Sequence, residues 1–104
     1  MASSKEYLEF VLEQLSETPG ITSRAMMGEY ILYVQGKVFG GVYDDRFLVK
    51  KTAAAVRLMP NAARELPYEG AKEMLLVENV DDRAFLAELV NAMADELPEP
   101  NRKK

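Results

Sequence analysis

Residues 24–50 read RAMMGEYILYVQGKVFGGVYDDRFLVK, and no other stretch says as much about the fold. Three of its runs are rich in β-branched and aromatic residues, namely 24–34, 37–43 and 46–50. Such residues suit the half-buried surface of a sheet. The polar pairs Gln-Gly at 35–36 and Asp-Asp at 44–45 are short breaks of the kind that reverse a chain between strands. The stretch therefore predicts three strands in an antiparallel meander.

Helical patterns flank this stretch on both sides. Ser3 and Glu6 have the spacing of a capping box, and apolar residues then recur at helical intervals until Pro19. After the meander, Thr52 is a suitable cap for a short helix over residues 53–59. We predict one helix before the strands and a shorter one after them.

The last third of the chain predicts two strands and a helix. Residues 65–70 contain a proline, which cannot donate to a central ladder, so they suit an irregular or edge strand. Residues 74–78 suit a regular strand. Asp81 is positioned to cap the last helix, with Val80 and Phe85 in hydrophobic-staple positions. The predicted buried stripe of this helix is Phe85, Leu86, Leu89, Val90 and Met93.

The element order α-β-β-β-α-β-β-α predicts a two-layer α+β fold, an antiparallel sheet with helices on one face. Ile31 and Tyr33 point away from Tyr30 and Leu32 in a strand, yet all four are apolar or aromatic. Both faces of the sheet therefore need cover. We expect the helices to cover one face and a second copy of the chain, as a homodimer, or a bound partner to cover the other.

Composition narrows the classes of function. The 104 residues correspond to one ordinary domain, predicted to span 1–97 with a disordered tail at 98–104. The absence of cysteine and histidine excludes disulfides, thiol catalysis, a histidine base and Cys/His metal sites. The sequence shows neither an apolar run of membrane-spanning length nor the order of a signal peptide. We expect a cytoplasmic protein that needs no membrane, metal or cofactor and is not an enzyme.

Two patterns that resemble catalytic motifs favour structural roles. Segment 36–41 is glycine-rich but lacks the Gly-Lys-Ser/Thr ending of a phosphate loop. Its glycines are expected to permit a bulge or a close backbone approach. The adjacent acids at 44–45 and 81–82 are typical of turns and helix caps, whereas acid–base work needs carboxylates that converge on one pocket.

A small positive patch is predicted from Arg46, Lys50, Lys51 and Arg57, which lie close in sequence. The chain as a whole has a formal net charge of −4 and shows no helix-turn-helix, zinc-finger or RNP pattern. A nucleic-acid-binding domain normally carries a strong basic footprint. Direct, specific DNA binding is therefore not expected.

The strand-rich stretch resembles the N-terminal domain of the TfoX/Sxy competence regulators. Residues 26–33, MMGEYILY, match that family's Met-Phe-Gly-Gly-Tyr-Gly-Leu-Tyr strand, and residues 44–50 match its Asp-Gly-Arg-Leu-Tyr-Leu-Lys strand. Residues 67–72, PYEGAK, are similar to its Tyr-Glu-Gly-Lys segment. The sequence departs from the family where Glu29 replaces a glycine, and no counterpart of the regulators' helical C-terminal domain follows Leu97.

The resemblance implies a fold like that of the secretion chaperones and a non-enzymatic role in competence and transcription regulation through a protein partner. The candidate partner-binding residues are Met27, Glu29, Tyr30, Tyr33, Arg46, Lys50 and Tyr68. One alternative is a chaperone-like dimer that holds a peptide, with Met26, Met27 and Met74 as adaptable contacts or simply as core filler. Another is an enzyme that uses tyrosine, lysine, arginine and glutamate.

Overall fold

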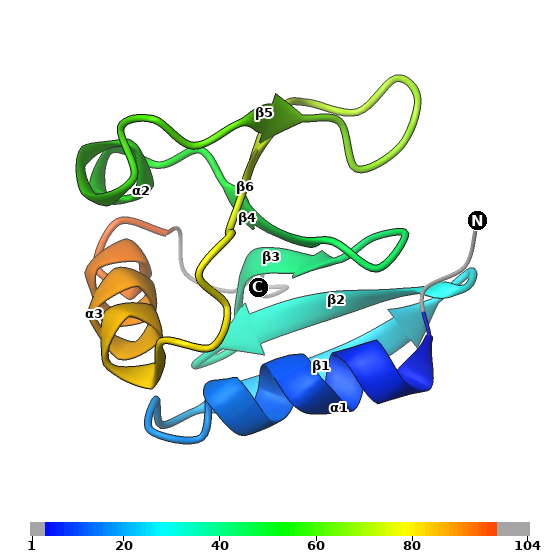
Figure 1. Cartoon of the computed structure of the whole chain (residues 1–104), viewed down its shortest axis with the longest axis horizontal. Helices are drawn as coiled ribbons and strands as arrows, with labels where there is room; N and C mark the ends of the chain where they lie inside the picture. The colour runs from blue at the N-terminus through cyan, green and yellow to red at the C-terminus, as the bar shows by residue number, and fades with distance from the viewer. Residues whose placement is uncertain (1–3, 98–104) are drawn as a thin grey trace, which may run out of the picture.

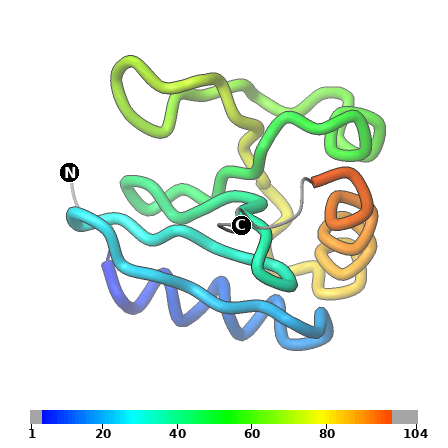
Figure 2. The backbone as a smooth tube through the Cα atoms, turned by 180° about the vertical axis from the view of Figure 1, so that it is seen from behind, coloured from blue at the N-terminus to red at the C-terminus, as the bar shows by residue number. Residues whose placement is uncertain are grey.

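The computed structural model describes residues 4–97 as a six-stranded antiparallel sheet with three helices (Figures 1 and 2). In chain order the elements are α1 (Lys5–Gln14), β1 (Ile21–Met26), β2 (Glu29–Val34), β3 (Lys37–Val42), β4 (Phe47–Lys50), α2 (Ala53–Leu58), β5 (Arg64–Glu65), β6 (Met74–Leu76) and α3 (Arg83–Ala94). The strands are ordered β1-β2-β3-β4-β6-β5 across the sheet. The predicted α+β class is confirmed. The predicted tail at 98–104 lies outside the described residues.

The element order differs from the prediction by one strand. Residues 24–34 do not form a single strand, because the chain reverses at Met27-Gly28 and pairs β1 with β2. Met27 and Gly28 have φ angles of 53° and 86°. Positive φ at both central residues is the signature of a two-residue hairpin turn whose twist suits the flanking strands. Methionine is not a turn residue, so Gly28 was the only sequence signal of this reversal.

The two predicted turns are confirmed and have the same form. Gln35-Gly36 has φ angles of 54° and 81°, and Asp44-Asp45 has 54° and 56°. Tyr43 and Arg46 exchange both backbone hydrogen bonds across the second of these turns. Asparagine, aspartate and glycine tolerate positive φ best, which explains the Asp-Asp pair. Strands β1 to β4 are therefore a meander of three tight hairpins.

Helix starts lie one residue later than predicted at two of three positions. Ser4 caps α1 by accepting a hydrogen bond from the Tyr7 backbone N–H, whereas Ser3, the predicted cap, lies outside the described residues. Asp82, not Asp81, caps α3 by accepting from the Phe85 N–H. Thr52 caps α2 as predicted. Adjacent Ser-Ser and Asp-Asp pairs offer two equivalent caps, so spacing alone did not choose between them.

All three helices pack on the same face of the sheet. Their apolar residues join those of β2, β3, β4 and β6 in one buried cluster. Figure 1 shows α1 lying along β1 and β2, and α2 and α3 pack side by side at the far end of the molecule. Leu86, Leu89, Val90 and Met93 of α3 are buried, but Phe85 is only half-buried. Phe85 therefore lies at the edge of the predicted stripe, and the fully buried part of the stripe begins at Leu86.

A bulge in β3 decides which side chains face outward. Leu32 pairs with Gly40 and Tyr33 pairs with Val38, so Phe39 is an extra residue in the β2–β3 ladder. Phe39 is fully buried in the helix-side core. Val38 and Tyr33 consequently share the opposite face. A Cβ on Gly40 would overlap the backbone of Leu48, so the expected close backbone approach is confirmed.

Candidate functional site

The face of the sheet opposite the helices, called the outer face here, carries a second and smaller apolar cluster. Tyr43, Leu48 and Met74 are buried there, and Leu76 packs against them. Leu48 pairs with Leu76 between β4 and β6, and Lys50 pairs with Met74. Leu48 has no exposed surface, although no helix lies on this side. The chain itself therefore covers part of the face for which we expected a second copy or a partner as cover.

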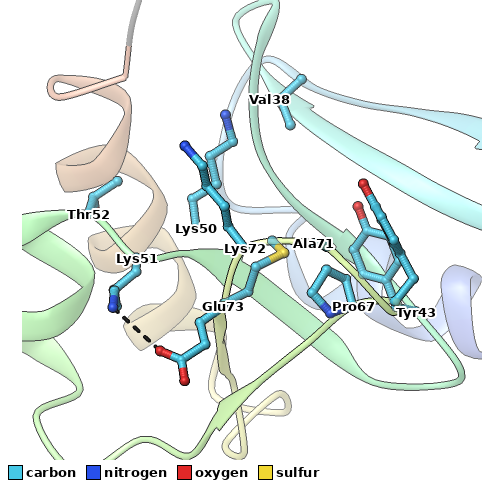
Figure 3. A pocket seen from close by; sticks show the side chains of 11 residues that line it. Val38, Tyr43, Lys50, Lys51, Thr52, Pro67, Ala71, Lys72 and Glu73 are labelled. Atoms are coloured by element: carbon cyan, nitrogen blue, oxygen red, sulfur yellow. Dashed lines mark ion pairs between the residues drawn. The ribbon is translucent and has the colours of Figure 1, made fainter.

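The cover comes from the β5–β6 loop, residues 66–73, which lies against the outer face. The Tyr68 ring centroid is 6.3 Å from that of Tyr43, with the ring planes tilted by 57°. Pro67 is buried in the same place. The loop and the sheet enclose a groove of about 740 Å³ (Figure 3). Small-molecule and peptide sites commonly have volumes of this order.

The groove has an apolar and aromatic part and a cationic part. The apolar and aromatic lining consists of Val38, Tyr43, Pro67, Tyr68, Ala71 and Met74. The polar lining consists of Lys50, Lys51, Thr52, Lys72 and Glu73. The lining contains three lysines and one glutamate, so the groove has a positive local charge, whereas the chain as a whole has a net charge of −4.

Two of the three lysines form no ion pair with any residue of the described part of the chain. Lys51 forms an ion pair with Glu73, with 3.5 Å between the Lys51 Nζ and a Glu73 carboxylate oxygen. Within residues 4–97, the side chains of Lys50 and Lys72 have neither a hydrogen bond nor an ion pair. Figure 3 shows the side chains of Lys50 and Lys72 extending in the same direction, on the other side of the groove from Tyr43. Their ammonium groups are therefore available to an anionic ligand.

Tyr43 and Tyr68 form the aromatic wall. Tyr43 is 8% exposed and Tyr68 is 60% exposed, so one ring is fixed in the sheet and the other is open to a ligand. Burial raises the pKa of the Tyr43 phenol, and Tyr68, Glu29 and Tyr33 raise it further. Tyr43 is thus a neutral phenol at physiological pH.

Gly41 leaves room for the Tyr43 ring on the outer face. A Cβ at Gly41 would lie 2.7 Å from the Tyr43 ring and 2.5 Å from the Tyr30 carbonyl oxygen. Both distances are too short for carbon contacts, so a side chain here would displace the ring or separate the strands. Gly41, the last glycine of the glycine-rich segment, therefore helps to shape the groove.

Arg46 fastens the β5–β6 loop to the sheet and is not a free positive charge. Its guanidinium pairs with the Glu65 carboxylate and donates to the Leu66 carbonyl oxygen at 3.2 Å. Its Nε donates to the Tyr43 carbonyl oxygen at 3.1 Å. The positive patch of the outer face is built around Lys50, Lys51 and Lys72, whereas the sequence had placed Arg46 in it.

The other candidate residues are spread over three places. Tyr33 lies on the outer face opposite Val38, and the Glu29 carboxylate accepts a hydrogen bond from the Asp44 N–H at 3.0 Å. Met27 lies at the tip of the β1–β2 hairpin and is 96% exposed. Tyr30 packs against the helix-side core, so it belongs to the opposite face.

Seven of the groove residues were not predicted from the sequence as binding residues: Val38, Tyr43, Thr52, Pro67, Ala71, Lys72 and Glu73. Val38 and Tyr43 were read only as strand residues, and Lys72 only as part of a segment similar to the family. Simple alternation would place Val38 and Tyr43 on opposite faces of the sheet, and the bulge at Phe39 that brings both to the outer face has no clear sequence signal. Of the three methionines considered for a peptide groove, Met74 lines this one, while Met26 and Met27 lie at the far hairpin tip.

Other classes of site are not visible in the described part of the chain. Among residues 4–97, no cluster of three or more potential ligand residues is placed to hold a metal ion. None of the helices described is long and apolar enough to cross a membrane.

Comparisons with known proteins give a family but no activity. The sequence model of the TfoX N-terminal domain matches residues 13–92, which include the whole sheet and every groove residue. A protein of Spirochaeta aurantia, described as an uncharacterized 12.7 kDa protein in the trpE 5′ region, is 34% identical over 105 residues, covering 100% of this chain and 91% of that protein. No solved structure matches, so the likeness to secretion chaperones stays a prediction. The chain belongs to the TfoX N-terminal domain family.

Proposed function

We propose that the protein is a non-enzymatic interaction module that holds a segment of a partner protein in the outer-face groove. The observation that carries the proposal is the combination of an apolar floor with two unpaired ammonium groups, Lys50 and Lys72, in an otherwise acidic chain. A concave site with an apolar lining and a few convergent polar groups is the usual form of a binding site.

The groups in the groove suit binding better than catalysis. The Glu73 carboxylate is paired with Lys51, so it is poorly placed to act as a free base. The raised pKa of Tyr43 keeps its phenol protonated and therefore a weak nucleophile at neutral pH. Binding needs only the contacts that these side chains already offer.

The role in the cell follows from family membership as a proposal. The sequence resembles the TfoX/Sxy competence regulators, and on that resemblance we place this module in the regulation of DNA transformation through a protein partner. A net charge of −4 disfavours close approach to a duplex. The partner, in this proposal, is the component that contacts the DNA or the transcription machinery.

A second candidate, a peptide-holding homodimer, is favoured by the exposed edge of the sheet. Five of the six residues of β1 are exposed, and Met26 beside the turn is 46% exposed. An uncovered edge strand is a template for pairing with a second copy. Light scattering at micromolar concentration tests this candidate: twice the monomer mass supports it, and a monomer mass contradicts it.

Photocrosslinking in the native host tests the leading proposal. Tyr68 and Phe10 are both exposed aromatic residues, one in the groove and one on α1. A photoreactive phenylalanine analogue replaces each in turn, so the two variants differ mainly in position. We expect a discrete protein adduct from position 68 and none of that mass from position 10. No adduct from position 68, or the same adduct from both positions, would contradict the proposal.

A further inference from the structure

We propose that the groove recognises an acidic segment of its partner, with an apolar or aromatic side chain of that segment anchored between the lysines and the tyrosines. This inference rests on the proposed function and states the chemistry of the occupant. It is carried by the separation of charged and apolar groups within the groove.

The cationic side of the groove is concentrated and uncompensated. Lys50 projects from the end of β4 and Lys72 from the β5–β6 loop, and their side chains extend in the same direction (Figure 3). Neither has an acidic partner among residues 4–97. Two ammonium groups on the same side of the groove attract carboxylates, so an acidic ligand is complementary in charge to this side.

The opposite side and the floor favour an apolar anchor. Tyr68 is 60% exposed, with its ring tilted against Tyr43, which is itself fixed by burial. Met74 and Pro67 belong to the same lining. An open aromatic ring beside a thioether is a favourable surface for an aliphatic or aromatic side chain. The charged and apolar contacts lie on opposite sides of the groove, so one segment would carry both residue types.

The surroundings do not favour a phosphate ligand or DNA. The groove offers lysines but no free arginine, because Arg46 is engaged by Glu65 and Leu66. Lysine acts as a point charge and does not provide the bidentate geometry that orients a phosphate. Two free ammonium groups would also release few counterions from a duplex, which gives weak and salt-sensitive binding.

A peptide-display selection with an unbiased library tests the inference. The groove variant carries Lys50→Glu with Lys72→Glu. The control carries Lys5→Glu with Arg57→Glu, two exposed positions outside the groove, so both variants have the same net charge. Thermal unfolding by circular dichroism checks that each variant is folded. A milder pair, Lys50→Gln with Lys72→Gln, removes the charge without reversing it.

We expect the wild-type protein to enrich peptides that combine aspartate or glutamate with an aromatic or aliphatic residue. The binding constant of the best peptide, measured by fluorescence anisotropy, should weaken at least about tenfold in the groove variant and less in the glutamine pair. The control should bind within about twofold of wild type, because its charges lie outside the contact.

Three results would overturn the inference: enrichment of peptides without acidic residues, no enrichment at all, or displacement of the best peptide by a short DNA duplex in the presence of near-physiological salt. These outcomes are distinct from a failure of the proposed function. If position 68 gives an adduct in the host but the selected peptides lack acidic residues, the proposed function is supported and only the inference of an acidic partner segment is contradicted. If position 68 gives no adduct but acidic peptides are selected, the groove binds acidic segments and the proposed function as a partner-binding module is contradicted.

Discussion

Tyr43 is a buried phenol in the wall of an open groove, and its ionisation links stability to pH. Burial raises its pKa in the folded protein above the ordinary tyrosine value of 10.0, and burial with Asp45 does the same for Tyr7. Both contributions to stability are complete below the ordinary tyrosine pKa. They are lost as pH rises towards the folded values, because the unfolded chain then releases protons that the folded chain retains.

We therefore predict that the free energy of unfolding falls as pH rises above about 10. Urea denaturation at a series of alkaline pH values measures this directly. The decline should be shallower in Tyr43→Phe and shallowest in Tyr43→Phe with Tyr7→Phe. A wild-type stability that stays level across this range would show that neither phenol is perturbed as described.

The neighbouring residues Leu86 and Phe85 of α3 differ in their contribution to the core. Leu86 has no exposed surface, whereas Phe85 is half-buried and borders the surface near Leu58 and Met59. Leu86→Ala should cost about 2–5 kcal/mol of unfolding free energy, the range for a fully buried leucine. Phe85→Ala should cost less, although its side chain is larger. The reverse order in denaturant melts would mean that the face of α3 has been assigned wrongly.

At the scale of elements, Arg46 connects the end of the β3–β4 hairpin to the β5–β6 loop. Its polar contacts with Glu65, Leu66 and Tyr43 hold the β5–β6 loop, which forms one wall of the groove, against the sheet. Arg46→Ala should cost only about 1 kcal/mol of global stability, because the pair is partly exposed. The substitution should nevertheless make the β5–β6 loop more mobile, because its polar contacts with the sheet are lost.

Hydrogen exchange followed by mass spectrometry measures that local effect. Peptides covering residues 66–73 should exchange faster in Arg46→Ala, while those covering β2 and β3 stay protected. Arg46→Lys should give an intermediate rate, because a lysine keeps the charge but lacks the forked donors. Unchanged exchange in the loop would show that apolar contacts of Pro67 and Tyr68 hold it without Arg46.

How far the sequence predicts these elements depends on how local their causes are. The turn at Asp44-Asp45 and the cap at Thr52 were predictable, because the residues that form them are adjacent in the chain. The Met27-Gly28 turn was missed because its first residue is not a turn former. The groove was not predictable, since it depends on a bulge at Phe39 and on Arg46 reaching Glu65, 19 residues away.

At the scale of the whole molecule, the negative net charge disfavours direct DNA binding by this chain. The groove holds three of the chain's 13 lysines and arginines, while the chain as a whole carries −4. We predict no mobility shift with short duplexes at micromolar protein in near-physiological salt. A sequence-dependent shift that Lys50→Glu with Lys72→Glu abolishes would instead make the groove a DNA site.

The central claim is that the outer-face groove is where this molecule holds its partner. Backbone amide NMR of the labelled protein, titrated with the best peptide from the selection, tests the location directly. We predict that shift changes concentrate at Val38, at Lys50–Thr52, at Tyr68 and at residues 71–74, all of which line the groove. Changes concentrated along the exposed strand β1 or on α1, with the groove unaffected, would contradict it.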